Sequence, residues 1–410
     1  MARARGACQN DVSMTDRLYY TDSYLTRFTA RVAALSEDGL TVGLDATAFY
    51  PASGGQPFDT GTLAGIPVAG VSEDGPTIVH RLAAPLDAAA SGGAAACVID
   101  WPRRFDHMQQ HSGQHLLSAV FEAHFGLKTC GFHMGAEVST IDLEGALEPR
   151  AAAEAESRAN RIVCENRAVS VAFEDAAEAG GLRKASGRQG ELRIVSIEDL
   201  DRSACGGTHV RSTGEIGAVL LRRIEKVRQA SRVEFLCGHR ATGRARADYD
   251  ALAGMARIFS APLDEVPALA AAQLEALRAQ DKARRKLELE LAACQGKEIY
   301  QAATPDPAGF RRVTRRAAGG VLEDLRAVAQ GFTAQPKAVF LGALADPPSL
   351  LLAVSEDAGI DAGKLLKTTL AELGGKGGGA ARMAQARFPD AASLEQAIGK
   401  LTTGTGHRLG

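Results

Sequence analysis

Residues 104–117 of this 410-residue chain read RFDHMQQHSGQHLL and combine apolar residues with closely spaced histidines. Apolar residues recur at helical intervals over 103–125 and Gly126 follows, so the sequence predicts a helix there. His111 and His115 are four residues apart, which on a helix places both imidazoles on one face, one turn apart. That geometry allows both rings to bind one cation, although paired histidines on a helix are more often solvated or packed in a core.

A second stretch, residues 203–210, reads SACGGTHV and places Cys205 four residues before His209. The two glycines between them allow a tight turn in which a thiolate and an imidazole converge, and the alternative is a plain Gly-rich turn between strands. Together the two stretches supply three imidazoles and one thiolate, a set that suits Zn²⁺. Four protein ligands are typical of structural zinc, whereas catalytic zinc keeps an open position, and the spacing does not decide between them.

The composition is that of an ordinary globular protein, with 23% charged and 45% apolar residues, which excludes wholesale disorder. A net charge of −2 argues against a polybasic protein that coats nucleic acid, but it leaves room for a local RNA-binding face. Seven scattered cysteines suit reduced thiols better than a disulfide framework. Because no apolar run approaches ~18 residues and none follows the basic start, we expect a cytoplasmic protein without a membrane span or secretory signal.

The length predicts two to four domains. Short apolar runs between Gly, Pro and Asp predict small strands in the first hundred residues or so. Interleaved helices and strands follow, and then a long helix at 261–295. The sequence therefore predicts an α+β fold with a small N-terminal β-barrel-like domain, a central α+β metal-binding domain, a long helical connector and a C-terminal α/β domain. The expected bounds are 1–13 for a leader, then 14–100, 101–245, 246–303 and 304–410 for these four parts. Further expected strands are 132–143, 191–197, 218–227, 337–344 and 350–355, and further expected helices are 148–167, 362–373 and 391–401.

Several segments resemble the editing domain of alanyl-tRNA synthetase and its free-standing relatives, the AlaX trans-editing proteins. They are HSGQHLLSAVF (111–121), FHMG with STIDL (132–135, 139–143), Glu165-Asn166, CGGTHV (205–210), FYPASGGQPFDTG (49–61) and GGKGGGAARMAQA (374–386). The last resembles the Gly-rich loop of the DHH-associated domain that closes alanyl-tRNA synthetases. The resemblance covers most of the chain and implies a Gly-motif domain at 14–100, a zinc-dependent editing domain at 101–245 and a tRNA-binding, oligomerising domain at 304–410.

The resemblance also implies an activity, the zinc-dependent hydrolysis of the ester that joins a wrong amino acid, chiefly serine and also glycine, to tRNA(Ala). The implied zinc ligands are His111, His115, Cys205 and His209. No ATP-binding motif is found, and 410 residues leave no room for an aminoacylation domain. We therefore expect a long-form AlaX-type deacylase that acts in trans on mischarged tRNA(Ala), with homodimerisation through the C-terminal region as a further expectation.

Other residues are candidates for catalysis and binding. His133 is the candidate catalytic base or hydrogen-bond donor, and a pocket-lining polar residue is the alternative. Cys130-Gly131 stands where relatives commonly have an apolar residue and Ser, so a hydroxyl that would help to read the amino-acid side chain is missing. The expected substrate-binding residues are Gly54, Gly55, Gln56, Gly206, Gly207 and Thr208. The expected tRNA-binding residues are Lys376, Gly377, Gly378 and Arg382, because glycines allow close approach to phosphates, and a plain surface loop is the alternative.

Two other functions fit the same residues. Editing domains of threonyl-tRNA synthetase share the HxxxH and Cys-x₃-His plan, so the substrate of this site could instead be Ser-tRNA(Thr). A noncatalytic tRNA-binding protein with a structural zinc would also use four protein ligands. Zinc content does not separate these functions, whereas a panel of deacylation substrates does.

Overall fold

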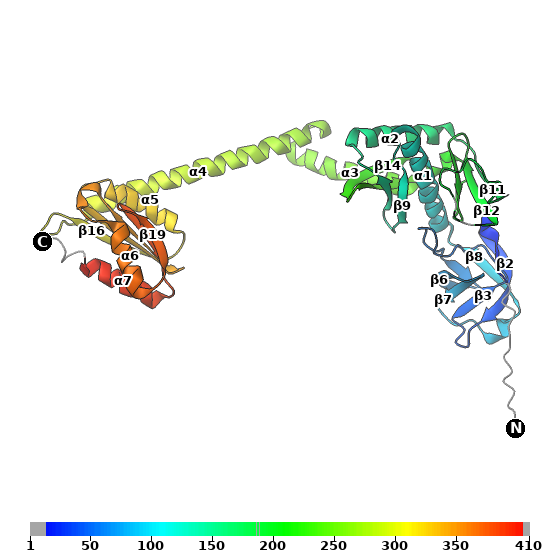
Figure 1. The fold of residues 1–410 in the computed structure, drawn as a ribbon, viewed down its shortest axis with the longest axis horizontal. Coiled ribbons are helices and arrows are strands. Elements are labelled where there is room, and N and C mark those ends of the chain that lie inside the picture. Colours follow the sequence, from blue (N-terminus) through cyan, green and yellow to red (C-terminus); the bar gives the residue numbers. More distant parts are fainter. Residues whose placement is uncertain (1–13, 186, 188, 405–410) are drawn as a thin grey trace, which may run out of the picture. The chain divides into compact units, whose positions relative to one another are not determined.

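The computed structural model describes residues 14–185, 187 and 189–404, so the predicted leader at 1–13 and the last six residues of the C-terminal part lie outside the described residues. The chain divides into two compact units, Met1–Met255 and Ala256–Gly410. Helices and sheets both occur along the chain, which confirms the predicted α+β class (Figure 1).

The first unit begins with a closed β-barrel, coloured blue to cyan in Figure 1. Its strands alternate inward and outward residues, and the inward side chains, among them Val32, Val42 and Leu63, form one apolar core. Closure pairs every strand on both sides and leaves no free edge. Around the barrel the strands are β2 (Arg27–Leu35), β3 (Thr41–Leu44), β7 (Thr77–Leu82), β6 (Ile66–Asp74), β5 (Gly61–Leu63) and β8 (Ala94–Ile99). The short strands β1 (Asp16–Arg17) and β4 (Ala46–Thr47) pair in parallel beside it.

Helix α1 (Trp101–Phe125) follows the barrel and carries the first two histidines. It begins where the Asp100 side chain accepts a hydrogen bond from the Arg103 backbone N–H, and it ends at Gly126 in a left-handed conformation with φ 65°. Every residue from 107 to 121 is buried, so the helix is enclosed on all sides. Its histidines are therefore held in a packed interior.

Two sheets and one further helix pack around α1. The four-stranded antiparallel sheet runs β14 (Val219–Val227), β15 (Ala230–Cys237), β10 (Ser139–Glu144) and β9 (Thr129–Met134). The three-stranded sheet runs β11 (Val169–Asp175), β12 (Glu191–Ile197) and β13 (Asp201–Ala204). Helix α2 (Pro149–Glu165) completes the apolar core with α1, β10 and β15, and α3 (Gly238–Phe259) follows β15. The prediction of one strand over 132–143 is wrong, because a turn at Gly135 divides this segment between β9 and β10, which pair with each other.

The second unit contains the 37-residue helix α4 (Val266–Ala302), which begins later and ends later than the predicted 261–295. Near its end α4 packs closely on α5 (Leu322–Thr333). A Cβ atom on Gly296 would lie 2.1 Å from the Val328 carbonyl oxygen, and one on Gly331 would lie 1.9 Å from that of Ala293. Glycine at both positions is what allows the two helix backbones to approach.

A five-stranded sheet with three helices forms the rest of the second unit. Its order is β16 (Arg311–Gly319), β17 (Ala338–Asp346), β18 (Ser349–Val354), β20 (Met383–Arg387) and β19 (Lys376–Ala380), and only β16 and β17 pair in parallel. Helices α6 (Ala362–Leu373) and α7 (Ala391–Gly404) pack with α5 on this sheet. The Gly-rich segment expected as a loop is an edge strand, β19, because its backbone pairs with β20. Among the described residues, no helix is both long and apolar enough to cross a membrane.

Candidate metal centre

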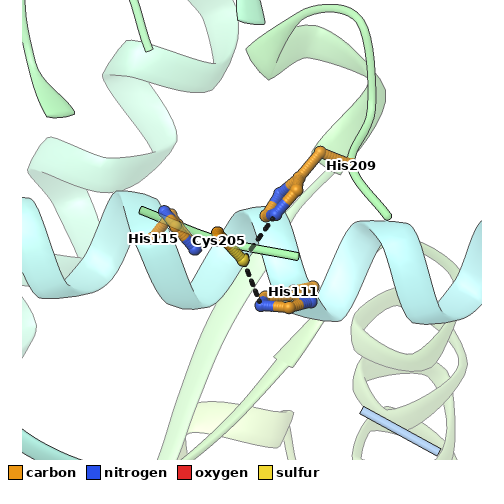
Figure 2. A group of neighbouring side chains, drawn as sticks. All are labelled: His111, His115, Cys205 and His209. Atoms are coloured by element: carbon orange, nitrogen blue, oxygen red, sulfur yellow. Dashed lines mark hydrogen bonds between the residues drawn. The ribbon is translucent and has the colours of Figure 1, made fainter. Parts of the chain in front are cut away.

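His111, His115, Cys205 and His209 converge in the first unit, as Figure 2 shows. Their potential ligand atoms all lie within 4.8 Å of one another. Cys205 Sγ is 3.4 Å from His111 Nε2 and 3.3 Å from His209 Nε2. Helix α1 supplies the first two residues, and the turn after β13 supplies the other two, so the two sequence stretches meet at one point.

Each of the three imidazoles has a separate partner on its Nδ1 side. His111 Nδ1 lies 2.8 Å from Gln56 Oε1. His115 Nδ1 lies 2.8 Å from the Asp201 carboxylate, and His209 Nδ1 lies 3.1 Å from Ser112 Oγ. With Nδ1 engaged, each ring keeps Nε2 for the centre of the group, which is the arrangement found around metal-ligating histidines.

The turn between Cys205 and His209 requires its second glycine. A Cβ atom on Gly207 would lie 2.1 Å from His111 Cε1 and 2.4 Å from His111 Nδ1, so any side chain would displace the ring. The Gly207 backbone N–H also donates to Cys205 Sγ at 3.4 Å. The turn therefore holds the sulfur in place and leaves room for His111.

The electrostatics of the group favour a thiolate. Burial acts to raise the pKa of Cys205, but the neighbouring His111 and His209 rings outweigh it and hold the thiol pKa well below its usual range. Burial, with His111 nearby, lowers the pKa of His209 to about 3. For His115 burial also acts to lower the pKa, but the Asp201 hydrogen bond and Cys205 prevail and raise it to about 9. A cation that binds here therefore meets a thiolate and must displace the proton that His115 holds.

The group borders a cleft of about 1010 Å³ in the first unit. His111, His115 and Cys205 line it, whereas His209 does not. Three tyrosines from the first fifty residues, Tyr19, Tyr20 and Tyr50, form part of the walls. The basic side chains in the lining are Arg17, Arg183, Lys184 and Arg193. A substrate in this cleft would face three of the four ligand side chains.

The predicted substrate-binding residues divide into two groups. Gly54, Gly206 and Gly207 line the cleft. Gln56 and Thr208 are buried behind His111, where Gln56 Nε2 donates to Thr208 Oγ1 at 2.8 Å, and neither lines the cleft. Gly55 is also absent from the lining, because it packs on β9.

His133 is not brought to the cleft. Its neighbour Phe132 lines the cleft, with its ring centroid 5.5 Å from that of His111. His133 itself is exposed and does not line the cleft. Cys130 and Gly131 do line the cleft, and the Cys130 thiol donates to the Asp142 carbonyl oxygen at 3.3 Å.

Sequence reasoning did not identify Asp201 and Ser112, the partners of His115 and His209. Asp201 is one of 49 acidic residues, and it meets His115 only through folding. Ser112 follows His111 directly, so its place inside the HSGQH motif was the one available signal.

The predicted tRNA-binding residues lie in the second unit. Lys376, Gly377 and Gly378 belong to β19, whose five residues are all exposed. Arg382 lies in the turn before β20 and forms an ion pair with Glu356 at 3.3 Å. They form an exposed strand edge with two basic side chains.

Comparison with known proteins identifies the relatives of this chain. Residues 192–232 match the "Threonyl and Alanyl tRNA synthetase second additional domain", and residues 314–403 match the DHHA1 domain. Alanyl-tRNA editing protein AlaX-L of Pyrococcus horikoshii is 31% identical over 392 residues, which are 91% of this chain and 95% of that protein. The AlaX-M editing protein of Methanosarcina acetivorans is 35% identical over 53% of this chain and 97% of its own length.

Alanine–tRNA ligase of Thermococcus kodakarensis is 30% identical over 95% of this chain, which spans only 43% of the ligase. The fold and these sequence matches show that the chain is related to the editing region of alanyl-tRNA synthetases. More narrowly, the chain belongs to the AlaX family of alanyl-tRNA editing proteins, which confirms the resemblance inferred from its motifs.

Proposed function

We propose that this protein hydrolyses mischarged tRNA(Ala) in trans, chiefly Ser-tRNA(Ala) and also Gly-tRNA(Ala), at a zinc site formed by His111, His115, Cys205 and His209. One observation carries the proposal. In a chain of the AlaX family, a group of three imidazoles and one low-pKa thiol borders a cleft that is large enough for an aminoacyl ester and its terminal nucleotide.

The donor set fits zinc. In a tetrahedral site with ligand bonds of ~2.0–2.3 Å, sulfur and nitrogen ligands stand roughly 3.5 Å apart. The Cys205 sulfur lies 3.4 and 3.3 Å from two imidazole nitrogens. When bound, zinc supplies two things that ester hydrolysis needs, a water of lowered pKa and polarisation of the ester carbonyl.

The residues around the metal site orient the three imidazole rings and shape the wall of the cleft. Gln56, Asp201 and Ser112 hold the three rings, so the site needs little reorganisation when substrate arrives. Gly206 and Gly207 keep the cleft wall thin beside His111. We assign no general base, because His133 lies outside the cleft.

Selection against alanine requires a polar partner for the serine hydroxyl. Thr129 and Gln114 both line the cleft, and both donate to Ser118 Oγ, at 2.7 and 2.8 Å. These bonds leave Thr129 Oγ1 and Gln114 Oε1 as acceptors for a substrate hydroxyl. An alanyl ester would leave them unpaired, which disfavours its binding.

A deacylation panel tests the function. Purified protein is incubated with Ser-tRNA(Ala), Gly-tRNA(Ala), Ser-tRNA(Thr) and Ala-tRNA(Ala), and release of the amino acid is measured. We expect rapid hydrolysis of Ser-tRNA(Ala), slower hydrolysis of Gly-tRNA(Ala) and little of the other two. Preferential hydrolysis of Ser-tRNA(Thr) would show that the protein edits mischarged tRNA(Thr) instead. Binding of tRNA without hydrolysis of any substrate would show that the protein is noncatalytic.

A pair of cysteine variants ties hydrolysis to the metal centre. Cys205→Ala removes one ligand, so we expect this variant to lose bound zinc. Its deacylation rate should fall by at least about 100-fold, because the metal's contribution to ester hydrolysis is lost. Cys130→Ala is the matched control, because Cys130 also lines the cleft but stands outside the ligand group. Full activity of metal-free Cys205→Ala would refute the proposed mechanism.

We also propose roles for the predicted domains. The barrel at 14–100 and the segment 101–245 make up the editing module, 246–303 is a connector, and 304–410 binds tRNA through Lys376, Gly377, Gly378 and Arg382 and mediates dimerisation. The DHHA1 match at 314–403 and the exposed basic edge of β19 support the tRNA-binding role. Gel filtration with light scattering measures the oligomeric state directly.

A further inference from the structure

The barrel reaches the metal centre through one turn, residues 53–56. Ser53 and Gln56 exchange two backbone hydrogen bonds, of 3.1 and 2.9 Å. Gly54 and Gly55 have φ values of 56° and 85°, so both central residues of the turn take conformations that favour glycine. The Gly-Gly pair therefore builds a tight hairpin turn and places Gln56 directly after it.

This turn is docked on strand β9. The Gly55 carbonyl oxygen accepts from the Met134 backbone N–H at 3.2 Å. A Cβ atom on Gly55 would lie 2.9 Å from the Phe132 ring and 3.0 Å from the Phe132 carbonyl oxygen, so only glycine allows this approach. The docked turn carries the Gln56 side chain, which is 2% exposed, to the back of His111.

The orientation of the Gln56 amide follows from its partners. The Thr208 backbone N–H lies 3.2 Å from one end of the amide, and because a backbone N–H can only donate, that end is the oxygen Oε1. The other end, Nε2, then donates to Thr208 Oγ1 at 2.8 Å. Both ends are thus assigned without reference to the histidine.

The same oxygen determines the tautomer of His111. Gln56 Oε1 lies 2.8 Å from His111 Nδ1, and a carbonyl oxygen can only accept, so Nδ1 must carry the hydrogen. In the neutral ring Nε2 is then the unprotonated nitrogen, and it faces Cys205 Sγ at 3.4 Å. A neutral imidazole binds a metal through this unprotonated nitrogen.

We propose that Gln56 is a positioning residue through which the barrel fixes the Nδ1–H tautomer of His111 and thereby becomes part of the metal centre. The other two rings are held by Asp201 and Ser112, from the segment that also supplies the ligands, so among the three rings His111 is the one whose Nδ1 partner comes from the barrel. The proposal departs from the sequence-based expectation that Gln56 touches substrate. It rests on the proposed metal site, but its first test needs no metal.

The first test is the protonation of His111 in the full-length, metal-free protein. Nitrogen-15 NMR of histidine-labelled protein, with His111→Gln to assign the signal, reports which ring nitrogen carries the hydrogen. We expect the Nδ1–H form for neutral His111 in the wild type and a mixture of tautomers in Gln56→Met. An Nε2–H ring in the wild type, or an unchanged tautomer in Gln56→Met, would overturn the proposal.

Metal affinity gives the second test. Zn²⁺ affinity is measured by chelator competition, and the site geometry is followed by the visible spectrum of the Co²⁺ form. We expect Gln56→Met to bind Zn²⁺ about 10–100-fold more weakly, the usual cost of losing such an outer partner. Gln56→Glu keeps an acceptor for both the His111 and Thr208 N–H groups, so it should restore affinity close to the wild-type value.

A matched control variant separates the positioning of His111 from general destabilisation of the fold. Gln110 is a fully buried amide on α1 that exchanges two hydrogen bonds with the Cys237 backbone, at 3.0 and 2.9 Å. Gln110→Met should lower thermal stability but keep the Co²⁺ spectrum, and equal loss of affinity in both Met variants would refute the proposal. If the wild type binds no Zn²⁺, the proposed zinc-dependent function is wrong. The NMR result on the metal-free protein still decides whether Gln56 fixes the tautomer of His111.

Discussion

At the scale of single residues, the metal centre depends on three partners of different chemistry. An amide, a carboxylate and a hydroxyl face the Nδ1 atoms of His111, His115 and His209. Only the carboxylate adds a charge, and it belongs to Asp201, whose other oxygen accepts from Arg183 at 2.6 Å. Burial alone would lower the pKa of His115, but the Asp201 hydrogen bond helps to raise it, so His115 holds a proton that competes with a metal.

This competition predicts a pH dependence. The raised pKa of His115, about 9, means that below this pH a metal must displace a proton, so affinity should rise with pH by about tenfold per unit and level off near pH 9. Asp201→Asn removes the charge that holds the proton, so the slope between pH 7 and 9 should flatten. Calorimetry in buffers of different ionisation enthalpy measures proton release, and equal release by wild type and Asp201→Asn would contradict this account.

Amino-acid selection is a second property of single residues. Thr129→Val keeps the shape of a cleft-lining side chain but removes its oxygen, which we propose receives the serine hydroxyl. The change should lower kcat/KM for Ser-tRNA(Ala) about 2–13-fold, as expected for loss of one neutral hydrogen bond. The rate for Gly-tRNA(Ala), which lacks the hydroxyl, should stay near the wild-type value. A parallel loss on both substrates would show a structural rather than a selective role.

At the scale of elements, the site depends on how α1 is fixed to the barrel. Arg104 lies two turns before His111 and is completely buried. Its guanidinium donates to the Asp59 carboxylate, to the Ser23 carbonyl oxygen at 2.8 Å and to the Ala48 carbonyl oxygen. One side chain thus ties the histidine helix to the barrel that carries Gln56.

Removing this tie should be costly. Arg104→Met leaves the Asp59 carboxylate buried without its cation, so we expect a loss of about 3–5 kcal/mol in the free energy of unfolding. Arg158→Met, which breaks an exposed i,i+4 pair with Glu154, should cost no more than about 0.5 kcal/mol. Urea denaturation of both variants checks the difference. Similar midpoints for the two would mean that Arg104 does not fix the helix.

Some of these elements could be predicted from the sequence and others could not. The helix over 103–125 was predictable from its helical period, and the four candidate ligands were predictable from their chemistry and spacing, because these are local signals. The division of 132–143 into two strands and the pairing of the Gly-rich segment as β19 were not, because both depend on partners remote in sequence. Gln56 was predicted as a substrate-binding residue, but it does not line the cleft, and its contact with His111 joins residues 55 positions apart and has no local signal.

At the scale of the whole molecule, a net charge of −2 conceals a local basic edge. Strand β19 is an exposed edge with Lys376 at its start, and Arg382 lies in the turn that follows. A trans-acting enzyme must release tRNA after each turnover, so a few phosphate contacts suit it better than a strongly cationic surface. The proposed tRNA-binding role of 304–410 rests on this edge.

Salt dependence tests that role. Lys376→Ala should weaken tRNA binding, and the slope of log K against log salt concentration should fall in magnitude by about one, the change expected for one lost phosphate contact. Lys286→Ala is the control, because Lys286 is an exposed lysine of α4 that pairs with Glu290 at 3.7 Å. Deacylation of an acceptor-stem minihelix should be unchanged in both variants, since the editing cleft is intact. An unaltered slope for Lys376→Ala would exclude β19 from the tRNA contact, whereas a loss on the minihelix would place Lys376 at the acceptor end.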